Sequence, residues 1–465
     1  MTPVRRDGGS YRDPSGYVFY QDGRVYRAIM ERARADYEAV REIPLVGELI
    51  RSGTIVGSRE LEPEQANLLV PEAAYVVEHD PVPFISYPFE WPFALLQRAA
   101  RFHLNLQLRL LEVGATLSDA TAYNVQFRGS RPVFIDLLSL RPYRDGELWL
   151  GLHQFMQQFM HPLLLNALAG VSYNNWYKGN LDGIRRAELV RCLPVMKRLS
   201  PRVFKQVVLP QMVETANRES DTKTTENAAP ARLDKSTFIA MLRDLDAWIG
   251  TLRPKTVSGT TWSDYEKTRT YNAGEIDEKR AVVAEFVSKH TPSVLWDIGC
   301  NTGEFSELAL QSGCDRAIGF DLDEGALHLA CERAEKNRLN LLPLGMDLLN
   351  PTAGCGWLGV ERKALVDRDP PDAIIALALI HHLAIAGNVP LGQAVAWLVS
   401  LAPKGIIEFV HKTDETVGQM LRFREDIFDD YHEEAFRHHL EVKAVILGRE
   451  KISASGRSLY IYQRR

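Results

Sequence analysis

The stretch LWDIGCNTGEF, from Leu295 to Phe305, decides the fold of the C-terminal half of this chain. It joins an apolar run to a helical one through small and turn-forming residues. Gly299 and Gly303 permit a tight turn and a close approach of the backbone to a ligand, which a Cβ would prevent. A dinucleotide-binding G-x-G-x-x-G loop starting at Gly299 would need glycines at positions 301 and 304, where this chain has Asn301 and Glu304. The stretch therefore predicts a strand, loop and helix that hold a ligand other than a dinucleotide.

Apolar runs alternate with helical runs around this stretch, which is typical of a parallel sheet covered by helices. The last two apolar segments, 441–447 and 458–462, lie too close together for a helical crossover and should pair as an antiparallel hairpin. The C-terminal half is therefore predicted to be an α/β domain with a seven-stranded mixed sheet, Rossmann-like. We expect its first five strands at residues 293–298, 316–321, 340–346, 373–380 and 405–410, and its helices at residues 277–289, 303–312, 324–337, 391–401 and 415–423.

Acidic residues follow the first three of these strands. Asp297 lies beside the glycine loop, where it would repel a pyrophosphate and suits a cationic ligand with an amino group. Asp321 could accept both hydroxyls of a ribose, while Met346 could cover an adenine and Asp347 accept from its exocyclic amine. Each acid alone could be a helix cap. Together they favour a nucleoside site, because ligands bind at the carboxyl edge of such sheets.

The sequence here resembles the class I S-adenosylmethionine-dependent methyltransferases over about residues 262–462, although Asn301 replaces the third glycine of their first motif. More narrowly, it is similar to a bacterial family of nodulation-related methyltransferases. The matching pieces are DIGCNTGEFS (297–306), Gly356-Trp357 with Glu361-Arg362, LALIHHL (377–383), NVP (388–390) and EFV (408–410). The resemblance implies S-adenosylmethionine as the cofactor and implies no particular acceptor. We expect the cofactor to contact Asp297, Gly299, Cys300, Asn301, Gly303, Asp321, Leu322, Met346, Asp347 and Leu379.

The fourth strand leads to a histidine pair, His381 and His382, at the sheet edge where a methyl group would be transferred. Neutral imidazole suits proton transfer near neutral pH, so these are the candidate base and its orienting partner. A histidine there could also simply bond a loop carbonyl. Glu408 is an acid in an apolar strand, so it must have a partner or face the cleft; it is the third catalytic candidate.

Two further groups have open roles. The charged residues between the third and fourth strands could bind a polar or anionic substrate, or lie on a solvated helix face. The aromatic residues ahead of the first helix could form a lid over the cofactor, or simply pack. The charged group consists of Glu361, Arg362 and Arg368. The aromatic group consists of Trp262, Tyr265 and Tyr271.

Composition limits the partners. The formal net charge is -5, and no basic run is interleaved with aromatics, so we expect no nucleic acid partner. No stretch approaches the roughly 20 apolar residues that span a bilayer, and no apolar leader follows the first methionine, so we expect no membrane insertion. The five cysteines show no metal-ligand spacing, which favours a reduced, cytoplasmic protein without a structural metal. The oligomeric state is left open.

The N-terminal half, residues 1–255, is predicted to be a separate α+β domain, with the methyltransferase domain over residues 256–465. Residues 219–235 have the composition of a mobile loop. We expect a hairpin over residues 16–27 around Asp22-Gly23, and helices over residues 91–113 and 237–252.

Asp119, Asn124 and Asp136 have the spacing of the catalytic base and metal ligands of protein kinases and small-molecule phosphotransferases. No lysine precedes Lys178, so the phosphate-gripping lysine is missing unless Arg27 replaces it. A degenerate, kinase-like domain that recognises the substrate is one interpretation. A turn built from Asp and Asn is the other.

The main hypothesis is methyl transfer from S-adenosylmethionine to an oxygen or nitrogen of a soluble acceptor: a small molecule, a glycan or a modified peptide. A non-catalytic module that binds S-adenosylmethionine, with a nucleotide-sensing or scaffolding N-terminal half, is the alternative. Phosphoryl transfer from ATP by the N-terminal half is a third hypothesis.

Overall fold

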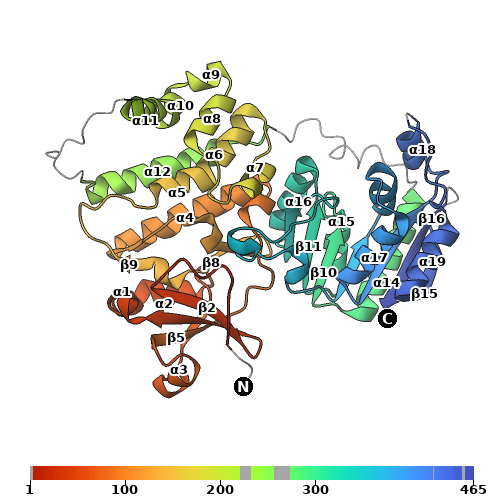
Figure 1. Ribbon diagram of the computed structural model, residues 1–465, viewed down its shortest axis with the longest axis horizontal. Coiled ribbons are helices and arrows are strands. Elements are labelled where there is room, and N and C mark those ends of the chain that lie inside the picture. The colour runs from red at the N-terminus through yellow and green to blue at the C-terminus, as the bar shows by residue number, and fades with distance from the viewer. Residues whose placement is uncertain (1–3, 220–231, 256–272, 423, 453–455) are drawn as a thin grey trace. The chain divides into compact units, whose positions relative to one another are not determined.

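The computed structural model describes residues 4–219, 232–255, 273–422, 424–452 and 456–465. These residues divide into two compact units (Figure 1). The first takes in the described residues up to 255, except 128–130, together with Cys355–Arg362. The second takes in the remainder. The predicted boundary at 255 borders residues 256–272, so it lies beside the undescribed part of the chain.

The second unit is built on one seven-stranded sheet with the strand order β12-β11-β10-β13-β14-β16-β15 (Figure 1). The first five strands are parallel, and β16 runs antiparallel to both of its neighbours. The predicted mixed sheet and its antiparallel pair are therefore confirmed. The strands are β10 (Val294–Ile298), β11 (Arg316–Asp321), β12 (Leu341–Gly345), β13 (Ala373–Ala376), β14 (Lys404–Val410), β15 (Ala444–Lys451) and β16 (Arg457–Arg464).

An α-helix separates each pair of parallel strands that follow one another in the sequence, as the alternating pattern predicts, except β12 and β13. These two are joined through the short 3-10 helices η8 (Trp357–Gly359) and η9 (Leu365–Asp367). Val283, Phe286 and Val287 of α14 form an apolar face that is buried with Leu295 of β10 and Ala309 of α15. Burial of such a stripe, rather than helix propensity, supplies most of the stability of a helix in a protein. The helices are α14 (Ala273–His290), α15 (Glu304–Gln311), α16 (Glu324–Lys336), η10 (His382–Ala386), α17 (Leu391–Leu401), α18 (Glu415–Leu421) and α19 (Glu433–Lys443).

Two predicted strands have the wrong limits. The fourth was expected over residues 373–380 but ends at Ala376, because Ala378 takes a left-handed backbone (φ 51°) that breaks the extended run. The sixth was expected over residues 441–447 but begins at Ala444, because helix α19 continues to Lys443. The histidine pair therefore lies at the start of η10 rather than at the end of a strand.

The first unit begins with a five-stranded antiparallel sheet of order β1-β2-β3-β5-β4. The hairpin predicted over residues 16–27 is confirmed, since β2 and β3 pair around Asp22 (φ 49°) and Gly23 (φ 77°). Two small pairs follow, β6 with β9 and β7 with β8. The strands are β1 (Arg5–Arg6), β2 (Gly16–Gln21), β3 (Arg24–Met30), β4 (Ser58–Glu60), β5 (Ala73–His79), β6 (Ala115–Leu117), β7 (Val125–Arg128), β8 (Arg131–Phe134) and β9 (Leu140–Pro142).

The helical part of the first unit is centred on the predicted helix over residues 91–113, observed as α4 (Phe93–Glu112). Helix α12 (Lys235–Thr251) packs beside it, with Arg101 Nε 2.9 Å from Asp246 Oδ1. Of the segment 219–235, residues 220–231 lie outside the described residues. The other α-helices are α1 (Arg34–Arg41), α2 (Pro44–Arg51), α3 (Pro63–Leu69), α5 (Leu152–Phe155), α6 (His161–Leu164), α7 (Asn174–Gly179), α8 (Arg186–Cys192), α9 (Val195–Arg198), α10 (Pro201–Val203) and α11 (Leu209–Glu219). The short 3-10 and π helices are η1 (Glu31–Ala33), η2 (Pro88–Glu90), η3 (Ala122–Asn124), η4 (Leu137–Ser139), η5 (Met156–Met160), η6 (Leu165–Ala169) and η7 (Phe204–Val208).

None of the helices in the described ranges is long and apolar enough to cross a bilayer.

Candidate functional site

The loop between β10 and α15 follows a path that depends on its glycines. Gly299 (φ 85°), Asn301 (φ 48°) and Gly303 (φ 75°) all take left-handed backbone, which glycine adopts freely and asparagine tolerates. The amides of Gly299 and Cys300 both donate to the carbonyl of Phe320 in the neighbouring strand. The loop is thereby held against the carboxyl end of β11.

The two loop glycines differ in what surrounds them. A Cβ on Gly299 would only reach ordinary contact with Leu379, at 3.6 Å, so this glycine borders open space. A Cβ on Gly303 would lie 3.1 Å from Leu341 Cδ2 and 3.4 Å from Ala330 Cβ. Gly303 therefore permits the start of α15 to pack closely against β12 and α16, and it lines neither of the hollows described below.

Asp297 is buried one residue before the end of β10. Its Oδ2 accepts a hydrogen bond from Ser306 Oγ at 2.6 Å. Burial, which disfavours the charged carboxylate, raises the pKa of Asp297 to about 7, and the nearby negative charge of Asp321 adds to this. A cationic group in front of Asp297 would favour its ionised form.

Asp321, at the end of β11, is fixed by the backbone around it. Its Oδ2 accepts from the amide of Asn301 at 2.7 Å, and its Oδ1 accepts from the amide of Asp323 at 2.9 Å. Burial raises the pKa of this carboxyl as well. Asp323, by contrast, accepts from the amide of Ala326 and caps α16, so of these two acids it is the helix cap.

Two adjoining hollows open at this edge of the sheet, and they share Gly299, Asn301, Leu377 and Ala378. The outer hollow encloses about 970 Å³, part of it open to solvent. Its lining includes seven residues predicted to contact a cofactor and several that were not. They are Gly299, Asn301, Asp321, Leu322, Met346, Asp347 and Leu379, and then Leu348, Leu349, Leu377, Ala378, His382, Leu383 and Ala386.

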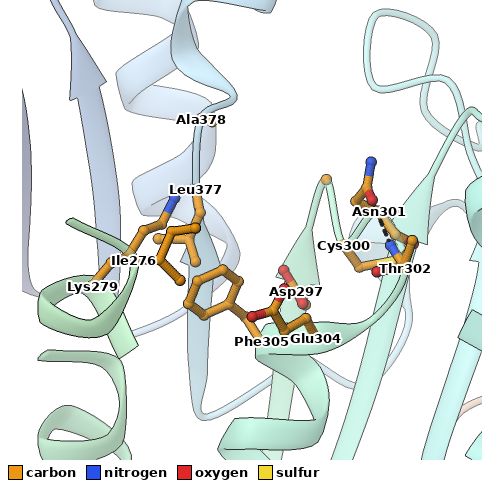
Figure 2. Close-up of a pocket in the computed structure, with 11 residues that line it drawn as sticks. Ile276, Lys279, Asp297, Cys300, Asn301, Thr302, Glu304, Phe305, Leu377 and Ala378 are labelled. Atoms are coloured by element: carbon orange, nitrogen blue, oxygen red, sulfur yellow. Dashed lines mark hydrogen bonds between the residues drawn. The ribbon is translucent and has the colours of Figure 1, made fainter. Parts of the chain in front are cut away.

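The inner hollow encloses about 560 Å³. Figure 2 shows Ile276, Lys279 and Leu377 on one side of it and the loop with Asn301 on the other, with Asp297 between them. Two of the predicted contacts that the outer hollow lacks, Asp297 and Cys300, lie here. The inner hollow therefore holds the acid that suits a cation, and the outer hollow the acid that suits a ribose.

The two histidines have different positions. His382 lines the outer hollow, whereas His381 is 1% exposed and its Nδ1 finds no hydrogen-bond partner among the described residues. The ring centroids lie 4.3 Å apart. Burial lowers the pKa of both, that of His382 to about 4, so both rings are neutral at neutral pH.

Glu408 is fully buried in β14 and has several partners. Its Oε2 accepts from Lys279 Nζ at 2.6 Å and from the amide of Ala378 at 2.8 Å. Its Oε1 lies 3.7 Å from Arg457, which is paired in turn with Asp414. Glu408 thus contacts Lys279 and Ala378, both of which line the inner hollow, and lines neither hollow itself.

Lys279 is the main residue that the sequence-based prediction missed. It is buried, and burial lowers the pKa of its amine despite the opposing charge of Glu408. One signal was available: Lys279 lies three residues after Ile276 and four before Val283, so it falls on the apolar stripe of α14.

In the first unit, the structure brings together the residues that suggest a phosphotransferase. Asn124 Nδ2 donates to Asp119 Oδ1 at 3.2 Å and to Asp136 Oδ2 at 3.2 Å, and Ser139 Oγ donates to Asp119. Arg27 Nη1 lies 2.9 Å from Asp136 Oδ1. Burial, with the charge of Asp136, raises the pKa of Asp119 to about 6.

The remaining candidates lie elsewhere or outside the described residues. Glu361 belongs to the first unit, where it accepts hydrogen bonds from Tyr11 and Arg12. The guanidinium carbon of Arg362 lies 4.0 Å from the centroid of the Tyr123 ring. Arg368 is buried in the second unit and lines neither hollow. The aromatic residues Trp262, Tyr265 and Tyr271 fall outside the described residues. The described residues contain no cluster of His, Cys, Asp and Glu that could hold a metal ion.

The strand order of the second unit, with its glycine loop after β10, defines a class I S-adenosylmethionine-dependent methyltransferase fold. The chain belongs to the family of the nodulation protein NoeA. It is 45% identical to "Nodulation protein NoeA" of Rhizobium meliloti (strain 1021) over 460 residues, which cover 99% of this chain and 96% of the relative. No protein-family model matches the chain.

Solved structures that match the chain with low similarity include methyltransferases. The N-methyltransferase NodS of Bradyrhizobium japonicum WM9 is 15% identical, with a TM-score of 0.31, over 42% of this chain and 98% of NodS. The magnesium protoporphyrin IX methyltransferase ChlM of Synechocystis PCC 6803, with bound SAH, is 18% identical, with a TM-score of 0.31, over 41% of this chain and 84% of ChlM. These similarities are too weak to assign an activity.

Proposed function

We propose that the second unit transfers a methyl group from S-adenosylmethionine to an oxygen or nitrogen of a soluble acceptor: a small molecule, a glycan or a modified peptide. The observation that carries the proposal is the pair of adjoining hollows at the carboxyl ends of β10, β11 and β12, with Asp297 in one and Asp321 in the other. A nucleoside that also carries positive charge matches this division.

The residues present fit such a cofactor. Each oxygen of Asp321 accepts one backbone amide, which leaves each a further lone pair for a ribose hydroxyl. Met346 and Asp347 follow β12 and line the same hollow, so an adenine has an apolar face and an acceptor there. Asp297 and the loop backbone line the inner hollow, which suits the amino acid part of the cofactor.

The cofactor supplies a methyl group bound to a positively charged sulfur, so the protein must mainly position a nucleophile and exclude water. His382 lines the outer hollow as a neutral ring and can accept a hydrogen bond from the acceptor. A pKa of about 4 makes it a weak base, so it orients the nucleophile more effectively than it removes a proton. His381 and Glu408 are then positioning residues.

Calorimetric titration of S-adenosylmethionine into the whole chain tests the proposal. We expect binding by the wild type and about 100-fold weaker binding by Asp321→Ala, since hydrogen bonds to a charged group contribute about 1.5–3 kcal/mol each. Asp315→Ala is the matched control, because Asp315 is exposed just before the opposite end of the same strand. Equal affinity of all three proteins, or no binding by the folded wild type, would reject the proposed site.

A non-catalytic module that binds S-adenosylmethionine is the alternative, and His382 separates the two. If His382→Ala keeps the cofactor affinity and lowers methylation of an acceptor, the enzyme hypothesis is supported. His381→Ala, beside it, should have the smaller effect, since His381 lines neither hollow. If neither histidine affects any turnover, the module hypothesis is favoured.

Nucleotide binding by the first unit is a second candidate function, favoured by the proximity of Asp119, Asn124 and Asp136. Arg27 already neutralises Asp136, which argues against efficient phosphoryl transfer and suits recognition of a phosphate or nucleotide-like group. Magnesium-dependent ATP binding that is lost in Asp136→Ala would support this function. If the wild type binds no ATP in the presence of magnesium, this second candidate function is rejected.

A further inference from the structure

Helices α9, α10, η7 and α11 lie together at one end of the first unit, the upper edge in Figure 1. Residues 201–219 form one continuous helical run in which Val203 and Val207 face the core. The opposite side of this run and the short helix α9 before it carry large apolar side chains that are open to solvent. These side chains, with their exposed fractions, are Val195 (65%), Met196 (78%), Leu199 (62%), Phe204 (38%), Leu209 (44%), Met212 (57%) and Val213 (51%).

The spacing of the exposed residues shows that they share one side of the helical run. Phe204 and Leu209 are five residues apart across the π-helix η7, and Leu209 lies three residues before Met212 and four before Val213, while Val203 and Val207 are buried. A helix that is apolar on both sides has either a second partner or a liability for aggregation. The exposed side is therefore a candidate interaction surface, here called the α9–α11 face.

The same region is strongly basic, although the whole chain carries a formal net charge of -5. Residues 185–215 contain seven Lys or Arg and two Glu, a net charge of +5. The acids that face them are Glu188 beside Arg185, Glu214 at 3.6 Å from Arg186, and Asp244 of α12 beside Arg202.

Other cations remain after these pairs are counted. Arg191 and Lys197 are exposed, and neither lies within 4.0 Å of a carboxylate in the part of the chain that the structure describes, although Glu188 feels the charge of Arg191 from a greater distance. The backbone carbonyls of Leu193 and Arg191 accept from the guanidinium of Arg198. Uncompensated positive charge thus accompanies the exposed apolar side chains.

We propose that the α9–α11 face binds the surface of an anionic lipid bilayer. Apolar side chains that enter the headgroup boundary, with Lys and Arg around them to meet the lipid phosphates, are the two contributions that hold an amphipathic helix on a membrane. The charge and the exposed apolar side chains together favour a lipid surface over a second copy of the chain and over a nucleic acid. A second copy docking through the same face would bring two clusters of like charge together. A nucleic acid would satisfy the charge and leave Met196, Leu199 and Met212 in water.

This binding is peripheral and independent of methyl transfer, so each can fail without the other. An enzyme held at such a surface would act on acceptors that are enriched there.

Co-sedimentation of the full chain with lipid vesicles tests the proposal. We expect binding to vesicles of phosphatidylcholine with an equal part of phosphatidylglycerol, little binding to phosphatidylcholine alone, and loss of binding at high salt. Arg191→Glu with Lys197→Glu should weaken binding by about 25-fold or more, because each basic residue near an anionic surface contributes about five-fold.

Apolar variants separate insertion from simple charge attraction. Met196→Asp with Met212→Asp should weaken binding by at least about ten-fold. Leu68→Asp is the control, since Leu68 is 72% exposed on α3, outside this face. All three substitutions are at the surface, so their unfolding curves should match the wild type.

Three outcomes would overturn the proposal: no binding of the wild type to anionic vesicles, equal binding to both kinds of vesicle, or equal binding by the Met196 and Met212 variant. A concentration-dependent dimer that this variant abolishes, with no vesicle binding, would assign the face to a second copy instead.

Discussion

At the scale of single residues, Lys279 and Glu408 show how far a sequence can predict a buried site. An acid in the middle of an apolar strand requires a partner, so the sequence indicated that Glu408 was not free. It could not indicate which partner, because Lys279 is 129 residues away and lies on a helix rich in charged residues. The strand-end acids Asp297 and Asp321 could be predicted because the strand order brings strand ends together; a contact between a helix and a distant strand follows no such rule.

The buried pair should be strongly coupled. Among the ion pairs of the described residues, Lys279→Met leaves Glu408 the more distant one with Arg457. Loss of one partner of a buried pair costs about 3–5 kcal/mol of unfolding free energy. The double variant Lys279→Met with Glu408→Gln should recover a large part of that loss. Urea unfolding measures the unfolding free energies of the single and the double variant. Lys289→Met, exposed on the same helix, should change stability by less than about 0.5 kcal/mol, and an additive double variant would contradict the coupling.

The raised pKa of Asp297 predicts a pH dependence. Its pKa of about 7 in the folded state lies above the ordinary value of 3.8 for an aspartate, so the folded state binds an extra proton between these pH values. The contribution of this group to stability is therefore present at low pH and is lost as the pH rises from about 4 to about 7. Asp297→Asn should show a flatter stability profile over that window, measured by thermal unfolding. A wild-type profile that is parallel to that of Asp297→Asn would show that the carboxyl is already ionised in the folded protein.

At the scale of elements, the sheet was predictable and its irregular ends were not. Apolar runs of the right length located five of the seven strands to within two residues at each end, because a buried strand leaves a plain apolar signal. The connection after β13 carries the same apolar residues, yet Ala378 leaves the extended conformation there. Its amide is held by Glu408, so a contact from another strand overrides the local pattern.

Ala378 is a non-glycine residue with φ of 51°, so glycine should be accepted at this position. A left-handed backbone costs an L-residue roughly 1–2 kcal/mol, and glycine loses roughly 0.5–1 kcal/mol through its greater chain entropy. We expect Ala378→Gly to be neutral or stabilising by up to about 1 kcal/mol. Ala376→Gly, two residues earlier in β13, should destabilise by about 1 kcal/mol or more. Denaturant unfolding of the two variants gives the comparison, and equal losses would show that Ala378 is not strained.

At the scale of the whole molecule, the chain does not divide at a single point. Cys355–Arg362 belongs to the first unit, although the chain on both sides of it, through β12 and β13, belongs to the second. Composition and periodicity gave no sign of this, because an eight-residue excursion has neither a core nor a repeat of its own. Glu361 fixes the segment: its Oε2 accepts from Tyr11 Oη at 3.2 Å, from Arg12 Nη2 at 3.1 Å and from the amide of Trp357 at 3.0 Å.

Two units with separate cores should unfold in two calorimetric transitions. If S-adenosylmethionine binds at the hollows of the second unit, it should raise only the transition of that unit, by about 2.7 kcal/mol of unfolding free energy when the ligand is at 100 times its Kd.

Glu361→Ala removes three hydrogen bonds from the first unit, one of them an ion pair with an exposed arginine. It should therefore lower the unfolding free energy of the first unit by roughly 1–3 kcal/mol. Glu64→Ala, at the exposed start of helix α3 in the first unit, is the control. If the cofactor shifts both transitions of the wild type, and Glu361→Ala removes the shift of the first, then Cys355–Arg362 links the stabilities of the two units. If it shifts only one in either protein, the segment is an anchor without influence on the methyl-transfer site.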